Sequence, residues 1–151
     1  MQRPPAGHPG AVDDTDRLQR FVDAQAGGTY ERALGELHAG RKTTHWMWFV
    51  LPQVAGLGRS STAQHYALRG LDEARAYLAH PVLGPRLRQC AEALAGSASG
   101  DPVAVMGPVD AIKLRSSMTL FARAAPDEPV FAQVLDRFFG GDEDPETVSR
   151  L

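Results

Sequence analysis

Glycine and proline divide the chain into short segments, and this punctuation limits what the chain can fold into. Its 151 residues include 15 glycines and 11 prolines. Glycine pairs such as Gly27-Gly28 end a helical pattern, while Asp101-Pro102 has the residue types preferred at a helix start. Between these points apolar residues recur three and four apart, and no credible pair of strands is found. The sequence therefore predicts an all-α fold, an irregular compact bundle of seven to eight short helices in a single domain.

The positions of these breaks predict where the helices lie. The apolar run 46–51 has no partner strand, so we expect either a buried extended segment or a single helical turn. After Pro108, the spacing of Val109, Ile112, Met118 and Phe121 predicts that all four are buried. The expected helices, with the glycines that end them, cover about 15–26, 29–40, 60–70, 71–79, 83–96, 102–106, 108–124 and 130–140, and Asp144-Pro145 adds a further cap signal.

Length and composition favour one helical domain over residues 15–151, preceded by a disordered tail over 1–14 that is rich in proline and glycine. The start lacks the features of a secretory signal, and the longest apolar run is too short to span a bilayer. The single Cys90 cannot form an internal disulfide. We therefore expect a cytoplasmic protein with no membrane partner. The net charge of −2 gives no reason to expect a sequence-specific nucleic-acid partner.

The segment 41–60 (RKTTHWMWFVLPQVAGLGRS) holds both tryptophans of the chain and no carboxylate. The wider window 37–71 also lacks Asp and Glu, so its basic side chains give it a formal charge of +4. Guanidinium groups match phosphate or carboxylate with paired hydrogen bonds, and an indole can stack on a base, which suits a nucleotide-like ligand. The alternative is that these aromatic residues form the core. The candidate ligand-binding residues here are Arg41, Lys42, Trp46, Trp48, Gln53, Arg59 and Ser60.

A second segment, 110–121 (DAIKLRSSMTLF), places polar residues three and four apart on one helix face. Lys113 with Ser116 or Ser117 could bind an anion, and Asp110 could orient Lys113. Alternatively, Asp110 and Lys113 form an ordinary ion pair along the helix, and the serines bond to their own backbone.

The sequence contains few signals for acid–base catalysis, metal binding or cofactor binding. His45 could act as a general acid or base, or serve as a hydrogen-bonded structural group. The histidines never form an HExxH pattern and no cysteine pair accompanies them, so we expect no metal site. No GxxxxGK[ST] or GxGxxG motif is present, and we expect no cofactor.

Several blocks of the sequence resemble a bacterial family known as domain of unknown function 1810. They are DRLQRFVDAQ, YERALGELHAGRKTTHWMWFVLPQVAGLGRS, LDEARAYLAHPVLGPRLRQC and the segment from MGPVDAIKLRSSMTLF to the last residue. The resemblance covers nearly all of 16–151 and implies a compact, mostly helical cytosolic protein, without a set of catalytic residues. Members are sometimes labelled calpastatin-like, but calpastatin is disordered, whereas this chain has the periodicity of a folded core. The family is also similar in size and helical character to ADP-ribose-processing proteins of the NADAR type.

These observations predict a cationic aromatic cleft between segments 41–60 and 110–121. We expect it to bind a small anionic ligand, a phosphate-bearing nucleotide-derived molecule such as ADP-ribose. If the protein is an enzyme, we expect a hydrolase of N-glycosidic or phosphate ester bonds, with His45 or Glu73 moving the proton. The alternative is a non-catalytic protein-interaction or regulatory module. The oligomeric state stays open.

Overall fold

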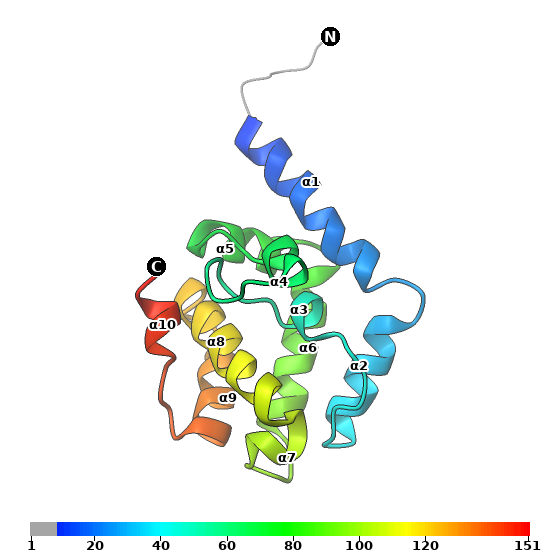
Figure 1. Ribbon diagram of the computed structural model, residues 1–151, viewed down its shortest axis with the longest axis vertical. Coiled ribbons are helices and arrows are strands. Elements are labelled where there is room, and N and C mark those ends of the chain that lie inside the picture. The colour runs from blue at the N-terminus through cyan, green and yellow to red at the C-terminus, as the bar shows by residue number, and fades with distance from the viewer. Residues whose placement is uncertain (1–8) are drawn as a thin grey trace.

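The computed structural model describes residues 9–151, with side chains from residue 17 onward. Within this part of the chain every regular element is a helix, and an isolated β-bridge joins Val54 to Leu68. The predicted all-α fold is confirmed, with ten helices in the described part where seven to eight were expected (Figure 1). The helices are α1 (Pro9–Ala24), α2 (Thr29–His38), α3 (Met47–Val50), α4 (Ser61–Tyr66), α5 (Leu71–Ala79), α6 (Leu83–Ala95), α7 (Pro102–Met106), α8 (Pro108–Ala124), α9 (Pro129–Phe139) and α10 (Pro145–Val148).

The helix bounds follow the capping signals closely. Helices α5, α7 and α8 have the predicted limits, and the Asp101 carboxylate accepts a hydrogen bond from the Val103 backbone N–H at 3.0 Å to cap α7. The two additional helices, α3 and α10, are single turns. Helix α1 begins at Pro9 rather than near Thr15, because extending an anchored helix costs less than starting one. Residues 1–8 of the expected disordered tail lie outside the described residues.

Helix α8 is the element against which α5, α7, α9 and α10 pack. Because it has neighbours on several sides, Leu114, Met118 and Phe121 are fully enclosed. The prediction that Val109 and Ile112 are also buried is wrong, since 63% and 68% of their surfaces are exposed. In the first turns of α8, Ala111 and Leu114 are buried, whereas the face that carries Val109 and Ile112 is not covered by another helix of the described chain. Two aliphatic side chains therefore stand at the surface near its start.

Aromatic rings connect four helices through the core. The ring centroids of Phe21 on α1 and Tyr77 on α5 are 5.1 Å apart, and those of Tyr77 and Phe121 on α8 are 5.6 Å apart. Phe131 on α9 continues the series at 5.8 Å from Phe121. These contacts stabilise the helices by burying large apolar surfaces in tilted and edge-on arrangements. They fix the scaffold on which α3 and its neighbouring loops rest.

No helix in the described part of the chain has the length and apolar character needed to cross a membrane. The Cys90 thiol lies fully buried on α6, as its spacing predicts, and burial raises its pKa to about 12. The thiol is therefore a packed core group rather than a nucleophile.

Candidate functional site

Glu36, near the end of α2, holds the start of the tryptophan segment in place. One carboxylate oxygen accepts hydrogen bonds from the backbone N–H groups of Thr43 and Thr44 at 2.8 and 3.1 Å, and from Trp46 Nε1 at 2.9 Å. The other oxygen accepts from Thr44 Oγ1 at 2.5 Å. Burial raises the pKa of Glu36, but the hydrogen bonds from Thr44, Thr43 and Trp46 outweigh it and bring the pKa to about 2. The ionised carboxylate thus fixes the loop that leads into α3.

Helix α3 places the two tryptophans in different surroundings. The run 46–51 forms one helical turn, so Trp46 and Val50, four residues apart, are buried together, while Trp48 is only half-buried. The Trp46 side chain is 1% exposed and its N–H is bonded to Glu36. The expectation that Trp46 stacks on a ligand is therefore wrong, because the core encloses its indole. Trp48 is the tryptophan that can meet a ligand.

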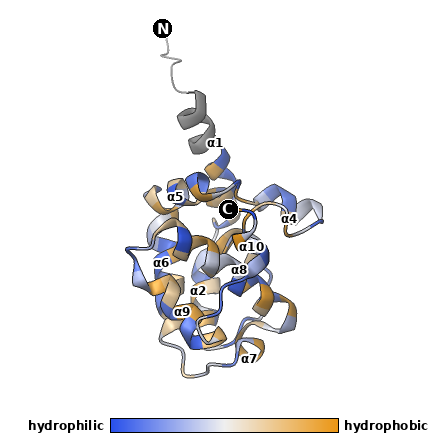
Figure 2. Cartoon of the chain, turned by 90° about the vertical axis from the view of Figure 1, so that its left-hand side faces the viewer, coloured by the Kyte–Doolittle hydropathy of each residue, from blue (hydrophilic) through white to orange (hydrophobic). Residues whose placement is uncertain are grey.

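The loop after α3 pairs with Leu68 through two backbone hydrogen bonds, one on each side of Val54. The Leu68 backbone N–H donates to the Gln53 carbonyl at 2.9 Å, and the Ala55 N–H donates to the Leu68 carbonyl at 2.7 Å. Further along, Gly58 approaches α4 so closely that an added Cβ would lie 2.5 Å from the Cβ of Ala63. A glycine is required there for the loop to close against α4. Helix α4 lies at the edge of the molecule (Figure 2), and none of its residues is buried.

A cavity of about 470 Å³ lies where this loop faces the first turns of α8 and the start of α10. It brings together residues from both segments that the sequence predicts to form a site, and six of the ten candidate ligand-binding residues line it. These six are Trp48, Gln53, Arg59, Ser60, Lys113 and Ser116. The other lining residues are Leu57, Gly58, Ala63, Val109, Ile112, Asp144 and Glu146.

An ammonium group covers the indole at the cavity wall. Lys113 Nζ lies 4.1 Å from the centroid of the Trp48 ring, a cation–π contact. Asp110 holds this lysine with an ion pair of 3.3 Å, and its other oxygen lies 2.7 Å from Lys42 Nζ. Two lysines thus share one carboxylate, which leaves one positive charge in excess beside Trp48. Lys42 itself is 6% exposed and also donates to the Thr44 carbonyl, so it is a structural cation and does not line the cavity as expected.

The lining as a whole is balanced in charge, which corrects the prediction of a cationic cleft. Arg59 and Lys113 are matched by Asp144, which caps α10, and by Glu146 in its first turn, both far along the chain from the carboxylate-free window. Asp144 Oδ2 accepts from Ser116 Oγ at 2.7 Å and from Thr147 Oγ1 at 2.6 Å. Burial raises the pKa of Asp144. The hydrogen bonds from these hydroxyls and from the backbone N–H groups at the start of α10 lower it by more, so the pKa of Asp144 lies below its ordinary value.

Four other candidates do not line the cavity. Arg41 and His45 are exposed in the loop before α3, and neither lines the cavity. Ser117 is fully buried in α8, and its hydroxyl has no hydrogen-bond partner in the part of the chain that the structure describes. Glu73 is buried on α5, where it forms an ion pair with Arg17 at 2.9 Å and accepts a hydrogen bond from the Arg69 backbone N–H. It lines a separate hollow. The proton-transfer roles expected for His45 and Glu73 therefore have no support in the geometry of this cavity.

Several residues that line the cavity are not predicted from the sequence as site residues. The helical spacing of Val109 and Ile112 predicts burial, and Asp144-Pro145 predicts only a helix cap, yet all three of Val109, Ile112 and Asp144 line the cavity. Periodicity shows that side chains share a helix face without showing whether another element covers that face.

Over the described residues, no group of three or more His, Cys, Asp and Glu side chains is arranged to hold a metal ion.

The structure thus defines a small all-α domain with a cavity between its tryptophan loop and its central helix α8. The chain belongs to the DUF1810 family of proteins of unknown function, whose family model matches residues 15–151. It is similar to the crystal structure of the conserved hypothetical protein Rv1873 from Mycobacterium tuberculosis, with 48% identity and a TM-score of 0.86. That match covers 89% of this chain and 95% of the other. No curated protein matches the chain. The family resemblance inferred from the sequence is confirmed.

Proposed function

We propose that the cavity binds a small phosphate-bearing, nucleotide-derived molecule such as ADP-ribose. The observation that carries the proposal is the position of Lys113 Nζ, 4.1 Å from the centre of the Trp48 ring in the wall of the cavity. An indole offers a flat surface to a base, and an adjacent ammonium offers a charge to a phosphate. A volume of about 470 Å³ is in the range of cavities that hold small molecules.

The charges near Trp48 support an anionic ligand despite the balanced lining. Asp110 is shared between Lys42 and Lys113, and Asp144 is already engaged by Ser116 and Thr147. The side chain of Arg59 is exposed and makes no hydrogen bond, ion pair or ring contact within the described residues. Its guanidinium can therefore turn toward a phosphate group without breaking an existing interaction.

Binding alone is proposed, because the cavity contains neither of the residues expected to move a proton. His45 and Glu73 do not line it. Its own carboxylates, Asp144 and Glu146, are two positions apart in the chain at the start of α10, where Asp144 caps the helix.

Isothermal titration calorimetry with ADP-ribose and AMP tests the proposal. Replacing Trp48 with Ala removes a stacking surface worth about 1 to 3 kcal/mol, so we expect affinity to fall by about 5- to 150-fold. Arg59→Ala should weaken binding by about tenfold, through the loss of one charged hydrogen bond. Arg41→Ala is the matched control, since Arg41 is an exposed cation of the same segment outside the cavity. Folded Trp48→Ala protein that binds both probes as tightly as the parent would refute the stacking role.

An interaction module is the second candidate, and one observation favours it. Val103, Val109 and Ile112 expose 49%, 63% and 68% of their surfaces on neighbouring helices α7 and α8. Exposed aliphatic side chains of this kind can contact a protein partner. Thermal-shift screening against nucleotides and phosphometabolites separates the two, because a ligand of the native state raises the melting temperature. A screen without any shift would favour the interaction module.

A further inference from the structure

Two polar groups beside the cavity lack partners. Neither the Trp48 indole N–H nor the Gln53 side-chain amide makes a hydrogen bond within the described residues. Trp46, two residues earlier, donates its indole N–H to Glu36 at 2.9 Å. A polar group that loses water without gaining a partner costs free energy, so most such groups in proteins are satisfied. Neither the Trp48 nitrogen nor the Gln53 amide is among the buried, unsatisfied polar atoms of the described residues, so both are open to water, which a ligand entering the site can replace.

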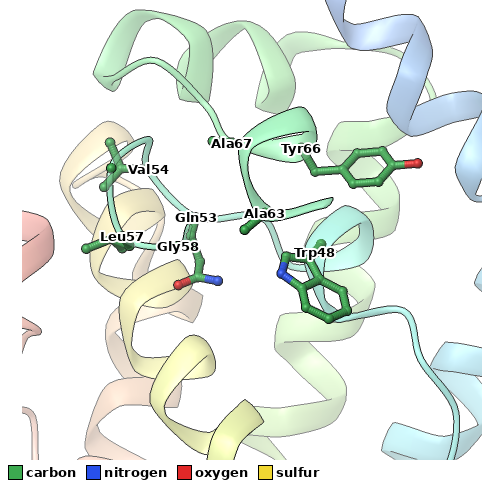
Figure 3. A pocket seen from close by; sticks show the side chains of 9 residues that line it. Trp48, Gln53, Val54, Leu57, Gly58, Ala63, Tyr66 and Ala67 are labelled. Atoms are coloured by element: carbon green, nitrogen blue, oxygen red, sulfur yellow. The ribbon is translucent and has the colours of Figure 1, made fainter. Parts of the chain in front are cut away.

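Both groups face a smaller hollow beside the main cavity. The Trp48 indole nitrogen and the Gln53 amide point toward each other across it, whereas the Tyr66 hydroxyl points away (Figure 3). The remaining lining consists of glycine and apolar residues, including Val54 and Leu57. Among the lining side chains, only Trp48 and Gln53 thus offer hydrogen bonds to what enters the hollow.

The size of the hollow limits what can enter. Its volume of about 20 Å³ is close to that of a single water-sized group. Five residues line both the hollow and the main cavity, so a ligand in the cavity can reach into it. An oxygen atom fits such a space, and a ring does not. The five shared residues are Trp48, Gln53, Leu57, Gly58 and Ala63.

The two groups are held in place by backbone contacts. The Gln53 carbonyl accepts from Leu68 N–H at 2.9 Å, which fixes the start of its side chain. The residue after Trp48 is anchored by the buried Gln25, whose Nε2 donates to the Phe49 carbonyl at 2.7 Å. Because the backbone on which they stand is fixed, binding a ligand orders the Gln53 side chain and requires little change in the backbone.

The chemistry of the indole decides what the hollow accepts. An indole N–H is a donor only, whereas a primary amide can present either its N–H₂ or its carbonyl oxygen. The group between them must therefore accept a hydrogen bond from Trp48, and the amide can turn its N–H₂ to meet it. We propose that the hollow binds one acceptor oxygen of the ligand, a phosphate oxygen or a ring carbonyl, held by Trp48 Nε1 and the Gln53 amide. This inference deepens the proposed function and rests on it.

Calorimetry with two matched variants tests the assignment. Trp48→Phe keeps a flat aromatic face and loses the N–H, so we expect AMP to bind about tenfold more weakly. Gln53→Glu replaces the amide with an acceptor-only carboxylate that repels the bound oxygen, and we expect a larger loss. Tyr66→Phe, which alters a side chain of the same hollow whose hydroxyl points away, should bind AMP as the parent does. Melting temperatures establish that each variant is folded.

Adenosine and inosine identify the source of the oxygen. A loss in Trp48→Phe with AMP but not with adenosine assigns a phosphate oxygen, because adenine has no carbonyl group. A loss with inosine but not with adenosine assigns a ring carbonyl. Trp48→Phe and Gln53→Glu proteins that bind all three probes like the parent overturn this inference, while a loss in Trp48→Ala alone still supports the proposed function. A parent protein that binds none of the probes overturns both.

Discussion

Replacing Glu36 with Gln should destabilise the fold in a pH-dependent manner. The carboxylate accepts four hydrogen bonds that fix the loop before α3 and pair the buried indole of Trp46. Glutamine has the same shape but only one acceptor oxygen and no charge. The substitution therefore weakens the contact that connects α2 to the tryptophan segment, with little change in volume.

The size of the effect follows from the pKa of Glu36. Burial raises this pKa and the hydrogen bonds lower it by more, so it falls from 4.5 to about 2. At about 1.36 kcal/mol per pKa unit, that difference corresponds to about 3 kcal/mol of preference for the ionised form in the folded state. Glu36 is partly exposed, so solvent screening reduces the expected contribution to about 2 kcal/mol. Because the folded pKa is depressed, this stability is present above about pH 4.5 and is lost as the pH falls toward 2.

Urea unfolding of the parent and of Glu36→Gln at pH 7 and pH 3 measures the difference directly. We expect the variant to be less stable by about 2 kcal/mol at pH 7, and the gap to shrink clearly at pH 3. Comparing the two proteins at each pH removes the contribution of other carboxylates. Glu31→Gln is the control, since Glu31 is an exposed residue of the same helix. A gap of the same size at both pH values would refute the reasoning, because it would show that the charge of Glu36 is not the source.

Three further predictions test the burial and charge of individual side chains. Ile112→Ala should change the free energy of unfolding by less than about 0.5 kcal/mol, while Met118→Ala should cost about 2 to 5 kcal/mol, as urea unfolding would show. Cys90 should not react with a thiol reagent at pH 8 until the protein unfolds, because its thiol is buried and its pKa is about 12. Glu146→Gln should raise the affinity for AMP by about two- to threefold in calorimetry at low salt, and the gain should fade at high salt, since its side chain is 72% exposed.

The helices could be predicted because their ends are encoded locally. Helix α7 begins at Pro102 and is followed by Gly107, α8 begins at Pro108, and α5 ends shortly before Pro81. Such signals are recognisable without knowledge of the fold, so these three helices begin and end where expected. Exposure could not be predicted in the same way. Ile112 and Met118 both lie on α8 at apolar spacing, but the burial of each depends on which other helix reaches its part of α8.

The candidate site was harder to predict because its charges come from separate parts of the chain. The carboxylate-free window 37–71 suggested a cationic cleft, but the cavity also contains carboxylates from α10. Glu36, which organises the window, stands one residue before it. A count of charges along the sequence cannot show that an acidic residue at a boundary or in a distant helix folds against the basic ones.

The accessibility of Trp48 follows from the burial of Trp46. In an extended segment residues 46, 48 and 50 would share one side, and both indoles would have had the same surroundings. In the observed helical turn each residue is rotated by about 100° from the last, so burying Trp46 together with Val50 directs Trp48 away from the core. Glu36 reinforces this choice, because it pairs the only polar atom of the Trp46 side chain and leaves that of Trp48 without a partner in the described residues. The requirement for a packed core thus places an indole with a free N–H at the cavity wall, where it can meet a ligand.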